Sequence, residues 1–373
     1  MKFRKFLLPV AVCATMFSLT SCGDKDVVVT LHNVGKDEAL TIKATDDKKE
    51  VAKVVKALHY TSYLNKDKTV DATKAKLSLN AELLDDSHTS KANAVVQYAL
   101  PELKNDATMD DLVKGLKVYA GIDGEFDMPA EDFEDSPFAV VMAFSKANAH
   151  LYTDDKKAYA DFKLTTKATE GVSASDVEMK GYLEKSLITS TILKSVPKSI
   201  GDVAEKGITN YNEYYKALKN YNLYTFASKG IETISKEESS TTAYLDLDTY
   251  LSQTNGQTVE GLVEKIGLKI IDAKNGDITF GIKKDLPGGK EEIVEASLTL
   301  NVETCLPKNF GFSLYFESNP TKSGVVHTSS IKINAGLEFG QDVPSLSDTK
   351  DYIINFGDFL GSFDPESESD LDY

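Results

Sequence analysis

The chain has 373 residues, with 42 Lys or Arg against 58 Asp or Glu, so its formal net charge is −16 at pH 7. Arg4 is the only arginine, and this acidic balance argues against nucleic acid as a partner and against docking on anionic lipid head groups through a basic patch. Apolar residues make up 41% of the chain, which is enough for a sizeable core and excludes wholesale disorder.

The N-terminal residues carry the pattern of an export signal. Basic residues precede an apolar run from Phe6 to Phe17, which ends in Leu19-Thr20-Ser21-Cys22. The run is broken by Pro9 and is shorter than the roughly 20 residues that span a bilayer. The order Leu, small, small, Cys resembles the lipobox of bacterial lipoproteins. That resemblance implies removal of a signal peptide, residues 1–21, and a diacylglyceryl group on Cys22. A plain secreted protein is the alternative.

The next elements are a short tether, a strand and a helix. Residues 22–46 are expected to hold the tether and a possible first strand, Val27–Leu31. A helix is predicted from Asp46 to Tyr60, because Asp46 or Asp47 can cap it. Four apolar residues of this segment share one helical face: Val51, Val54, Val55 and Leu58.

From Ala75 the apolar residues recur at every second position, which predicts strands. Strands are expected at 75–83 and 92–100, joined by a turn at 85–88, and again at 140–144, 147–152 and 158–164. A short helix, 109–117, and an acidic loop, 123–135, are predicted to lie between them.

Two helices are predicted in the middle of the chain, Leu183–Val196 and Ile208–Phe226, followed by a strand at Thr241–Leu247 and a helix at Val259–Ile266. Lys274-Asn275-Gly276-Asp277 is a strong hairpin signal. Further strands are expected at 268–271, 278–282, 294–302, 310–316 and 325–339. The C-terminal segment 347–373 ends in acidic residues without a base, so its tail is predicted to be disordered.

Roughly ten strands with hairpin-length connections predict an α+β, β-rich fold around a large antiparallel sheet. A sheet of this size tends to curl, so we expect a half-barrel with helices packed on its concave face. The element order, the segment Asp155–Phe162 and the closing strands of 306–344 resemble those of LolA-like and LppX-like lipid and lipoprotein carriers. The resemblance covers residues 47–346 and implies that the concave face holds an acyl chain or lipid.

The sequence lacks the common motifs of catalytic sites. No Gly-x-Ser-x-Gly elbow, phosphate-binding Gly loop or His-Glu-x-x-His motif occurs, and the five histidines are scattered. With Cys13 lost in the leader and Cys22 acylated, only Cys305 is left, so no intramolecular disulfide is expected. We interpret Cys305 as a packing residue beside Leu306.

Two patterns deserve a test against the structure. The acidic residues from Asp123 to Glu134 follow a register like that of an EF-hand, but Met128 stands where the sharp-turn Gly is expected, and we favour a solvated loop. The tyrosines from Tyr211 to Tyr224 could stack on a ligand, but an amphipathic helix packed on the sheet is the simpler interpretation.

The sequence therefore predicts a non-enzymatic, membrane-anchored lipoprotein on the extracytoplasmic side of the cell envelope. It would bind an apolar ligand, an acyl chain or lipid, or a partner, in a curved sheet. Its membrane contact would be the acyl chains on Cys22. A surface interaction or adhesion module with a solid core is the alternative, and an unrecognised hydrolase is a weaker one. Cys22 is the one site residue assigned; no catalytic residue, metal ligand or cofactor is predicted, and the ligand-binding residues stay unassigned.

Overall fold

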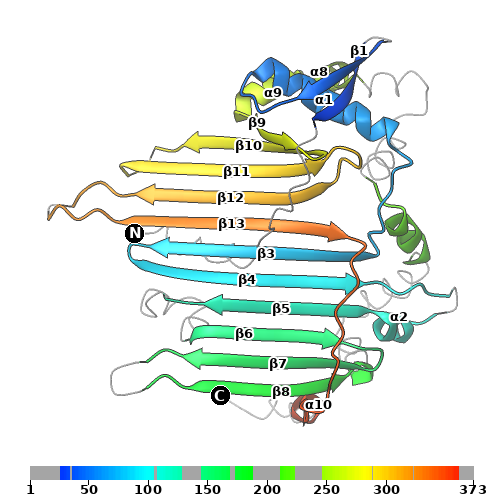
Figure 1. The fold of residues 1–373 in the computed structure, drawn as a ribbon, viewed down its shortest axis with the longest axis vertical. Coiled ribbons are helices and arrows are strands. Elements are labelled where there is room, and N and C mark those ends of the chain that lie inside the picture. Colours follow the sequence, from blue (N-terminus) through cyan, green and yellow to red (C-terminus); the bar gives the residue numbers. More distant parts are fainter. Residues whose placement is uncertain are drawn as a thin grey trace, which may run out of the picture. The chain divides into compact units, whose positions relative to one another are not determined.

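The structure is a computed structural model that describes residues 26–33, 36–104, 107–127, 144–168, 173–187, 211–222, 246–287, 289–321 and 323–360. Within these residues the chain is dominated by strands (Figure 1). The strands are β1 (Val27–Asn33), β2 (Lys36–Ile42), β3 (Lys74–Asp85), β4 (His88–Ala99), β5 (Lys117–Glu125), β6 (Phe144–Thr153), β7 (Lys157–Thr166), β8 (Asp176–Glu184), β9 (Lys269–Lys274), β10 (Asp277–Asp285), β11 (Glu291–Asn301), β12 (Pro307–Glu317), β13 (Thr328–Phe339) and β14 (Ile354–Asn355). The helices with defined bounds are α1 (Lys48–Leu64), α2 (Met109–Gly115), α8 (Leu247–Asn255), α9 (Val259–Ile266) and α10 (Phe356–Leu360).

Twelve strands form one sheet in the order β14-β8-β7-β6-β5-β4-β3-β13-β12-β11-β10-β9, and β1 and β2 form a separate hairpin. The described registers are antiparallel, except that β14 lies parallel to β8. The strand order has two ends and does not close into a barrel. The predicted fold class, β-rich with a large sheet and a few helices, is confirmed.

The chain forms two compact units. The first comprises residues 1–72, 77–91 and 217–339, and the second comprises residues 73–76, 92–216 and 340–373. Each unit is described in turn.

In the first unit, strands β10 to β13 separate an apolar face from a polar one. Phe280 lies opposite Leu298, and Leu298 lies opposite Phe310, so these three side chains share one face because residues paired across strands point the same way. The neighbouring row, Gly281, Ser297 and Gly311, points to the other face.

The hairpin between β9 and β10 turns at Asn275 and Gly276, whose φ angles are 54° and 78°. Two successive positive φ values are what a tight turn between twisted antiparallel strands requires, and Asn-Gly adopts them at low cost. The hairpin predicted from these residues is therefore confirmed.

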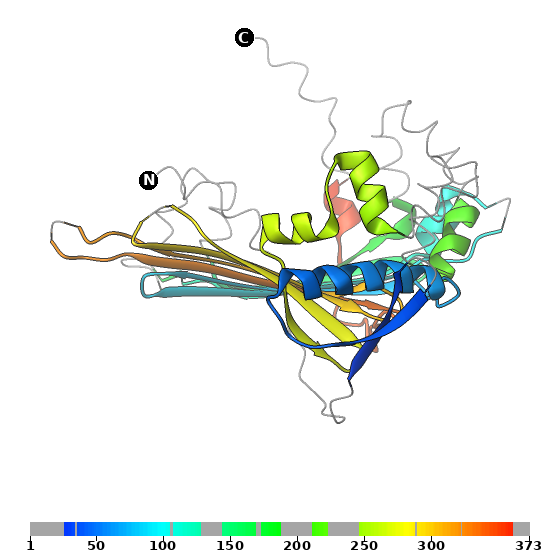
Figure 2. The same cartoon turned by 90° about the horizontal axis from the view of Figure 1, so that it is seen from above.

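Helix α1 lies at the centre of the first unit's core. Asp47 caps it by accepting hydrogen bonds from the backbone N–H of Lys49 at 2.8 Å and of Glu50 at 3.2 Å, as the sequence predicts. Its buried residues, which include Val51, pack with β1, β2, α9 and the start of the sheet at β9 and β10 (Figure 2). The apolar members of this core are Val27, Val29, Leu31, Ile42, Val51, Ala52, Val54, Ala57, Leu58, Val259, Val263, Ile270, Ile278, Phe280, Val302 and Cys305.

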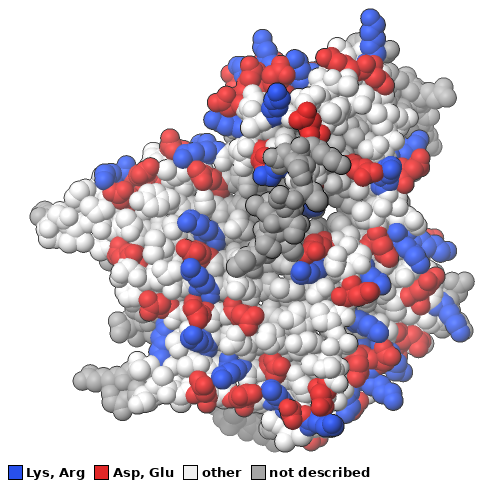
Figure 3. All heavy atoms as spheres, in the orientation of Figure 1, with Lys and Arg blue, Asp and Glu red and all other residues white. Residues whose placement is uncertain are grey.

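In the second unit, strands β5 to β8 follow one another in chain order. On one face they carry the row Ala149, Phe162 and Met179. The opposite face carries four paired tyrosines, Tyr119, Tyr152, Tyr159 and Tyr182. Over the second unit, Lys side chains are interspersed with Asp and Glu rather than gathered into a patch of one sign (Figure 3).

The segment after β13 returns to the sheet of the second unit. Tyr352 is buried, packs edge-on against Tyr159 at a centroid distance of 5.4 Å, and donates a hydrogen bond from its hydroxyl to Asp161 at 2.9 Å. Strand β14 then pairs with β8 at Gly181. A Cβ at this glycine would lie 2.6 Å from the carbonyl oxygen of Ile354, so Gly181 allows the close approach of the two backbones.

Several predicted elements differ from the structure. Leu183 belongs to β8 and only residues 185–187 of the predicted helix are helical, while residues 188–196 lie outside the described part. Leu247 begins α8, which Asp246 caps, instead of ending a strand. Residues 123–125 are the end of β5 and not a loop. Strand pairing explains the first and third differences, because β8 pairs with β7 and β5 pairs with β6. The second has a local cause, because Asp246 caps the helix that begins at Leu247.

Candidate functional site

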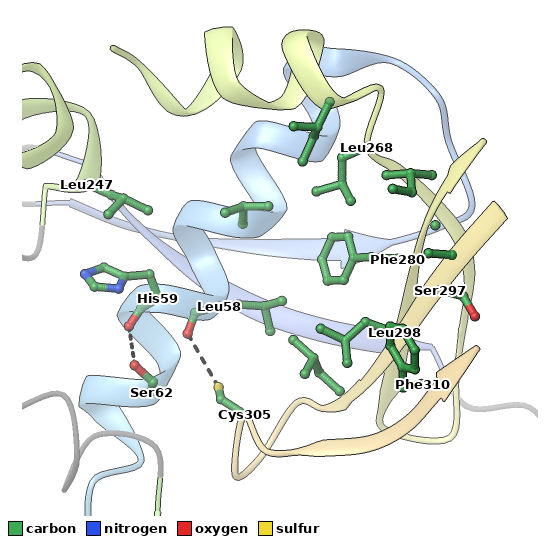
Figure 4. Close-up of a pocket in the computed structure, with 16 residues that line it drawn as sticks. Leu58, His59, Ser62, Leu247, Leu268, Phe280, Ser297, Leu298, Cys305 and Phe310 are labelled. Carbon is green, nitrogen blue, oxygen red and sulfur yellow. Dashed lines mark hydrogen bonds between the residues drawn. The ribbon is translucent and has the colours of Figure 1, made fainter. Parts of the chain in front are cut away.

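The first unit contains a groove of about 530 Å³ between α1 and the apolar face of β10 to β12 (Figure 4). It is lined mostly by apolar side chains from α1, the segments around α8 and α9, and these strands. The lining residues are Val55, Leu58, His59, Ser62, Leu247, Ile266, Leu268, Phe280, Gly281, Ile282, Ala296, Ser297, Leu298, Leu300, Cys305 and Phe310.

Helical and strand periodicity bring these side chains together. Val55, Leu58, His59 and Ser62 are spaced at three- and four-residue intervals, so they form one stripe along α1. The sheet contributes the row Phe280, Leu298 and Phe310, which alternation directs to the same face. A helical stripe therefore lies over a sheet face, with the groove between them.

Part of the groove is accessible to solvent. Phe280 is 5% exposed, whereas Leu298 is 38%, Phe310 is 45% and Ile266 is 53% exposed. Large apolar side chains that stay half-exposed next to one another mark a surface that binds something apolar more often than an isolated exposed leucine does. This surface is the strongest candidate for a binding site among the described residues.

Two side chains of the lining donate hydrogen bonds to backbone carbonyls of α1. The Ser62 hydroxyl donates to the backbone carbonyl of His59 at 2.6 Å, and the Cys305 thiol donates to the carbonyl of Leu58 at 3.5 Å. The Ser297 hydroxyl points away from the apolar cluster, whereas the His59 ring lies near Leu247 at one end of the groove (Figure 4). The interior of the groove is thus apolar, with an imidazole at its end.

Cys305 is a structural residue of this region. It is 3% exposed, and burial raises the pKa of its thiol to about 11, so the reactive thiolate is scarce at neutral pH. It lies in the connection between β11 and β12, with a φ of 55°. This agrees with the packing role predicted for it beside Leu306.

The structure places several histidines next to carboxylates. Three of them lie beside an aspartate of the same unit: His32 beside Asp37 at 3.0 Å, His150 beside Asp161 at 3.0 Å and His327 beside Asp86 at 2.8 Å. His150 also approaches Asp123 at 3.6 Å. Sequence reasoning missed these pairs and also His59, which could have been found as the continuation of the apolar stripe of α1.

The two tested patterns have structural explanations. Asp123 accepts a hydrogen bond from Asn148 at 2.5 Å and Glu125 pairs with Lys146 at 2.8 Å, so both are engaged across β5 and β6, and the rest of the EF-hand-like register beyond residue 127 lies outside the described residues.

Two of the tyrosines, Tyr211 and Tyr221, have structural roles. Residues 211–219 are helical. Tyr211 donates to the carbonyl of Pro101 at 2.7 Å, and burial raises its pKa to about 12. Tyr221 forms a bridge with Val70, which ends the helix earlier than predicted. Tyr214 is 66% exposed, and Tyr224 lies outside the described residues.

Clusters of metal ligands and membrane-spanning helices are both missing from the described residues. No group of three or more His, Cys, Asp or Glu side chains there is placed to hold a metal ion. Among the helices of the same residues, none is both long enough and apolar enough to cross a membrane. The predicted lipidation site, Cys22, lies outside the described part of the chain.

Comparisons with known proteins give little guidance. No family model matches the chain, and no curated protein matches it. Among solved structures, the chain is similar to a DUF1329 family protein from Desulfovibrio piger, with 7% sequence identity over 77% of this chain and 93% of that one, and a TM-score of 0.17. A TM-score this low does not establish a shared fold.

Proposed function

We propose that this chain is a non-enzymatic, lipid-anchored lipoprotein of the cell envelope that holds an apolar ligand, such as an acyl chain, in the groove of the first unit. The observation that supports the proposal is the groove itself. Its walls are the apolar stripe of α1 and the row Phe280, Leu298 and Phe310, and two members of that row are more than a third exposed.

Burial of hydrocarbon supplies the driving force for binding. Each methylene group that leaves water contributes about 0.8 kcal/mol, and a ligand would also cover the exposed parts of Leu298 and Phe310. The groove volume of about 530 Å³ falls within the range of roughly 300 to 1,000 Å³ that is usual for small-molecule sites. A single hydrocarbon chain fits these two requirements better than a polar solute does.

The anchor supports the same proposal. Acyl chains on Cys22 would hold the protein at a membrane, where acyl-bearing ligands are abundant. The acidic surface repels anionic head groups, so attachment would depend on the acyl chains and not on charge. Membrane lipid is accordingly the proposed partner, and nucleic acid is not.

The test measures binding in the full-length Cys22→Ser chain, which cannot carry the anchor and so leaves the groove free of the protein's own acyl chains. Native mass spectrometry should detect co-purified lipid, and a fluorescent acyl probe should be displaced by saturated chains. Lengthening the competitor by two methylene groups should tighten binding about 15-fold, until the chain outgrows the groove. A folded protein that carries no lipid and takes up no probe would refute the proposal and favour a surface interaction module.

A further inference from the structure

The first unit has a second groove, on the polar face of its sheet. It measures about 520 Å³ and is lined by residues of strands β9 to β13. Two rows of residues paired across β10 to β13 form most of it: a first row of Gly281, Ser297, Gly311 and Asn334, and a second row of Lys283, Glu295, Ser313 and Lys332. We call this groove the polar trough.

The first row provides the floor of the polar trough. Gly281 and Gly311 have no side chains there, and a Cβ at Gly311 would lie only 2.5 Å from the hydroxyl oxygen of Ser297. The floor is therefore main chain with one short hydroxyl side chain. Neighbouring strands lie about 4.8 Å apart, so a row across four strands spans about 14 Å. A groove of this length suits an elongated ligand better than a single small ion.

The charged side chains of the polar trough reverse the balance of the chain. The chain has 58 Asp or Glu and 42 Lys or Arg, whereas the trough is lined by three Lys and one Glu. Glu295 pairs with Lys283 at 3.1 Å, and Lys269 lies 3.7 Å from Asp46. Lys332 is exposed and has no hydrogen-bond or ion-pair partner among the described residues. Its ammonium group is therefore complementary to a negative charge on a ligand.

Uncharged polar groups lie beside Lys332. The exposed amide of Asn334 is two residues along β13, and the hydroxyl of Ser313, which donates to Glu295 at 3.4 Å, lies on the neighbouring strand. Together with Ser297 they offer both donors and acceptors to a ligand. Strands β11 and β12 are paired on both sides, so their main-chain groups are used within the sheet. A peptide that needs main-chain hydrogen bonds would find few partners on this face.

We propose that the polar trough binds an acidic oligosaccharide, with a carboxylate of the sugar at Lys332 and its hydroxyl groups at Asn334 and Ser297. The inference goes beyond the proposed function, because it concerns the opposite face of β10 to β12. Sugar hydroxyls both donate and accept, as amide and hydroxyl side chains do, and a carboxylate is complementary to an ammonium group. The Debye length is about 8 Å at physiological ionic strength, so Lys332 acts on a ligand in the trough more strongly than distant acidic residues do.

The experiment compares a charged sugar with an uncharged one of the same backbone. The folded, full-length Cys22→Ser chain is titrated by calorimetry with tetragalacturonate and with its fully methyl-esterified form, near neutral pH and at about 0.15 M ionic strength. The ester keeps the free hydroxyl groups of the sugar ring and lacks the negative charges. Tetragalacturonate should bind about fivefold more tightly than the ester, which is the scale of one exposed ion pair.

Three variants locate the site. Lys332→Gln should lower the affinity for tetragalacturonate about fivefold and change that for the ester less than about twofold. Asn334→Ala should weaken the binding of both sugars. Lys284→Gln is the matched control, because Lys284 is an exposed lysine next to Lys283 on β10 whose side chain points to the opposite face. It should bind both sugars as the parent does.

The possible outcomes separate this inference from the proposed function. Equal affinity for the two sugars, or the parent's affinity for tetragalacturonate in Lys332→Gln, would overturn the assignment of Lys332. A hexaglutamate peptide that binds as tightly as tetragalacturonate would show that the ligand class is wrong. If neither sugar binds at concentrations up to about 5 mM while the fluorescent acyl probe still binds, the trough is not a saccharide site and the proposed function stands. If the sugars bind and the acyl probe does not, the proposed function fails and this inference stands.

Discussion

Substituting Phe310 by Asp should block the groove without unfolding the protein. Phe310 is 45% exposed, so it contributes only about half of the roughly 1.5 to 3 kcal/mol that full burial of such a side chain is worth. The expected loss of stability is therefore about 0.8 to 1.5 kcal/mol, which a domain of ordinary stability tolerates.

The effect on binding should be much larger. An acyl chain lying over the new carboxylate would strip it of water and offer it no hydrogen bond, at a cost of several kcal/mol. Since every 1.4 kcal/mol is a factor of ten, the dissociation constant for a fluorescent acyl probe should rise about a hundredfold or more. Fluorescence titration measures the constant, and urea unfolding of the same samples measures the stability.

Ile271→Asp provides the matched control. Ile271 is 53% exposed on β9 and does not line the groove. Both variants place the same poor strand former at a half-exposed apolar position, so they should lose similar stability. The control should keep the parent's affinity. If Phe310→Asp binds the probe within about threefold of the parent, or if both variants weaken binding equally, the assignment of the groove is refuted.

Three further outcomes are expected. Cys22→Ser should move the protein from the membrane pellet to the soluble fraction, because the acyl chains of the diacylglyceryl group are then lost; unchanged sedimentation would contradict lipid anchoring. Peptide-resolved alkylation of Cys305 should be slow in the folded protein at about pH 8 and fast in urea, since the pKa of the buried thiol is raised to about 11. Burial and the bond to Asp154 raise the pKa of Tyr159 from 10.0 to about 12, so its stabilising contribution is complete below pH 10.0 and is lost as the pH rises toward 12. Urea midpoints measured across that window should fall less steeply for Tyr159→Phe than for the parent.

The elements with strong local signals could be predicted from the sequence. Asp47 caps α1, and Asn275-Gly276 forms the tight turn between β9 and β10. Both depend on interactions within a few residues, which is why spacing alone reveals them. The alternation in 294–302 and 310–316 likewise predicts β11 and β12, because successive side chains of a strand point to opposite faces and the apolar ones gather on one of them.

Elements that depend on distant partners could not be predicted in this way. Strand β8 has exposed residues on both faces over Asp176–Met179, so its sequence lacks a clear buried face, and it is defined by pairing with β7 and β14. The groove is harder still to predict from the sequence, because α1 and the strands β10 to β12 are separated by about 200 residues. Periodicity shows that α1 and these strands each have an apolar face. Only the fold shows that the two faces lie opposite each other with a groove between them.

An exposed apolar groove and a strongly acidic chain are compatible for a physical reason. Half-exposed side chains such as Leu298 and Phe310 favour association between copies, whereas a net charge of −16 favours separation. The repulsion acts between any two copies but does not oppose an uncharged hydrocarbon chain. Both features therefore fit the apolar ligand proposed for the groove better than they fit a second copy of the chain.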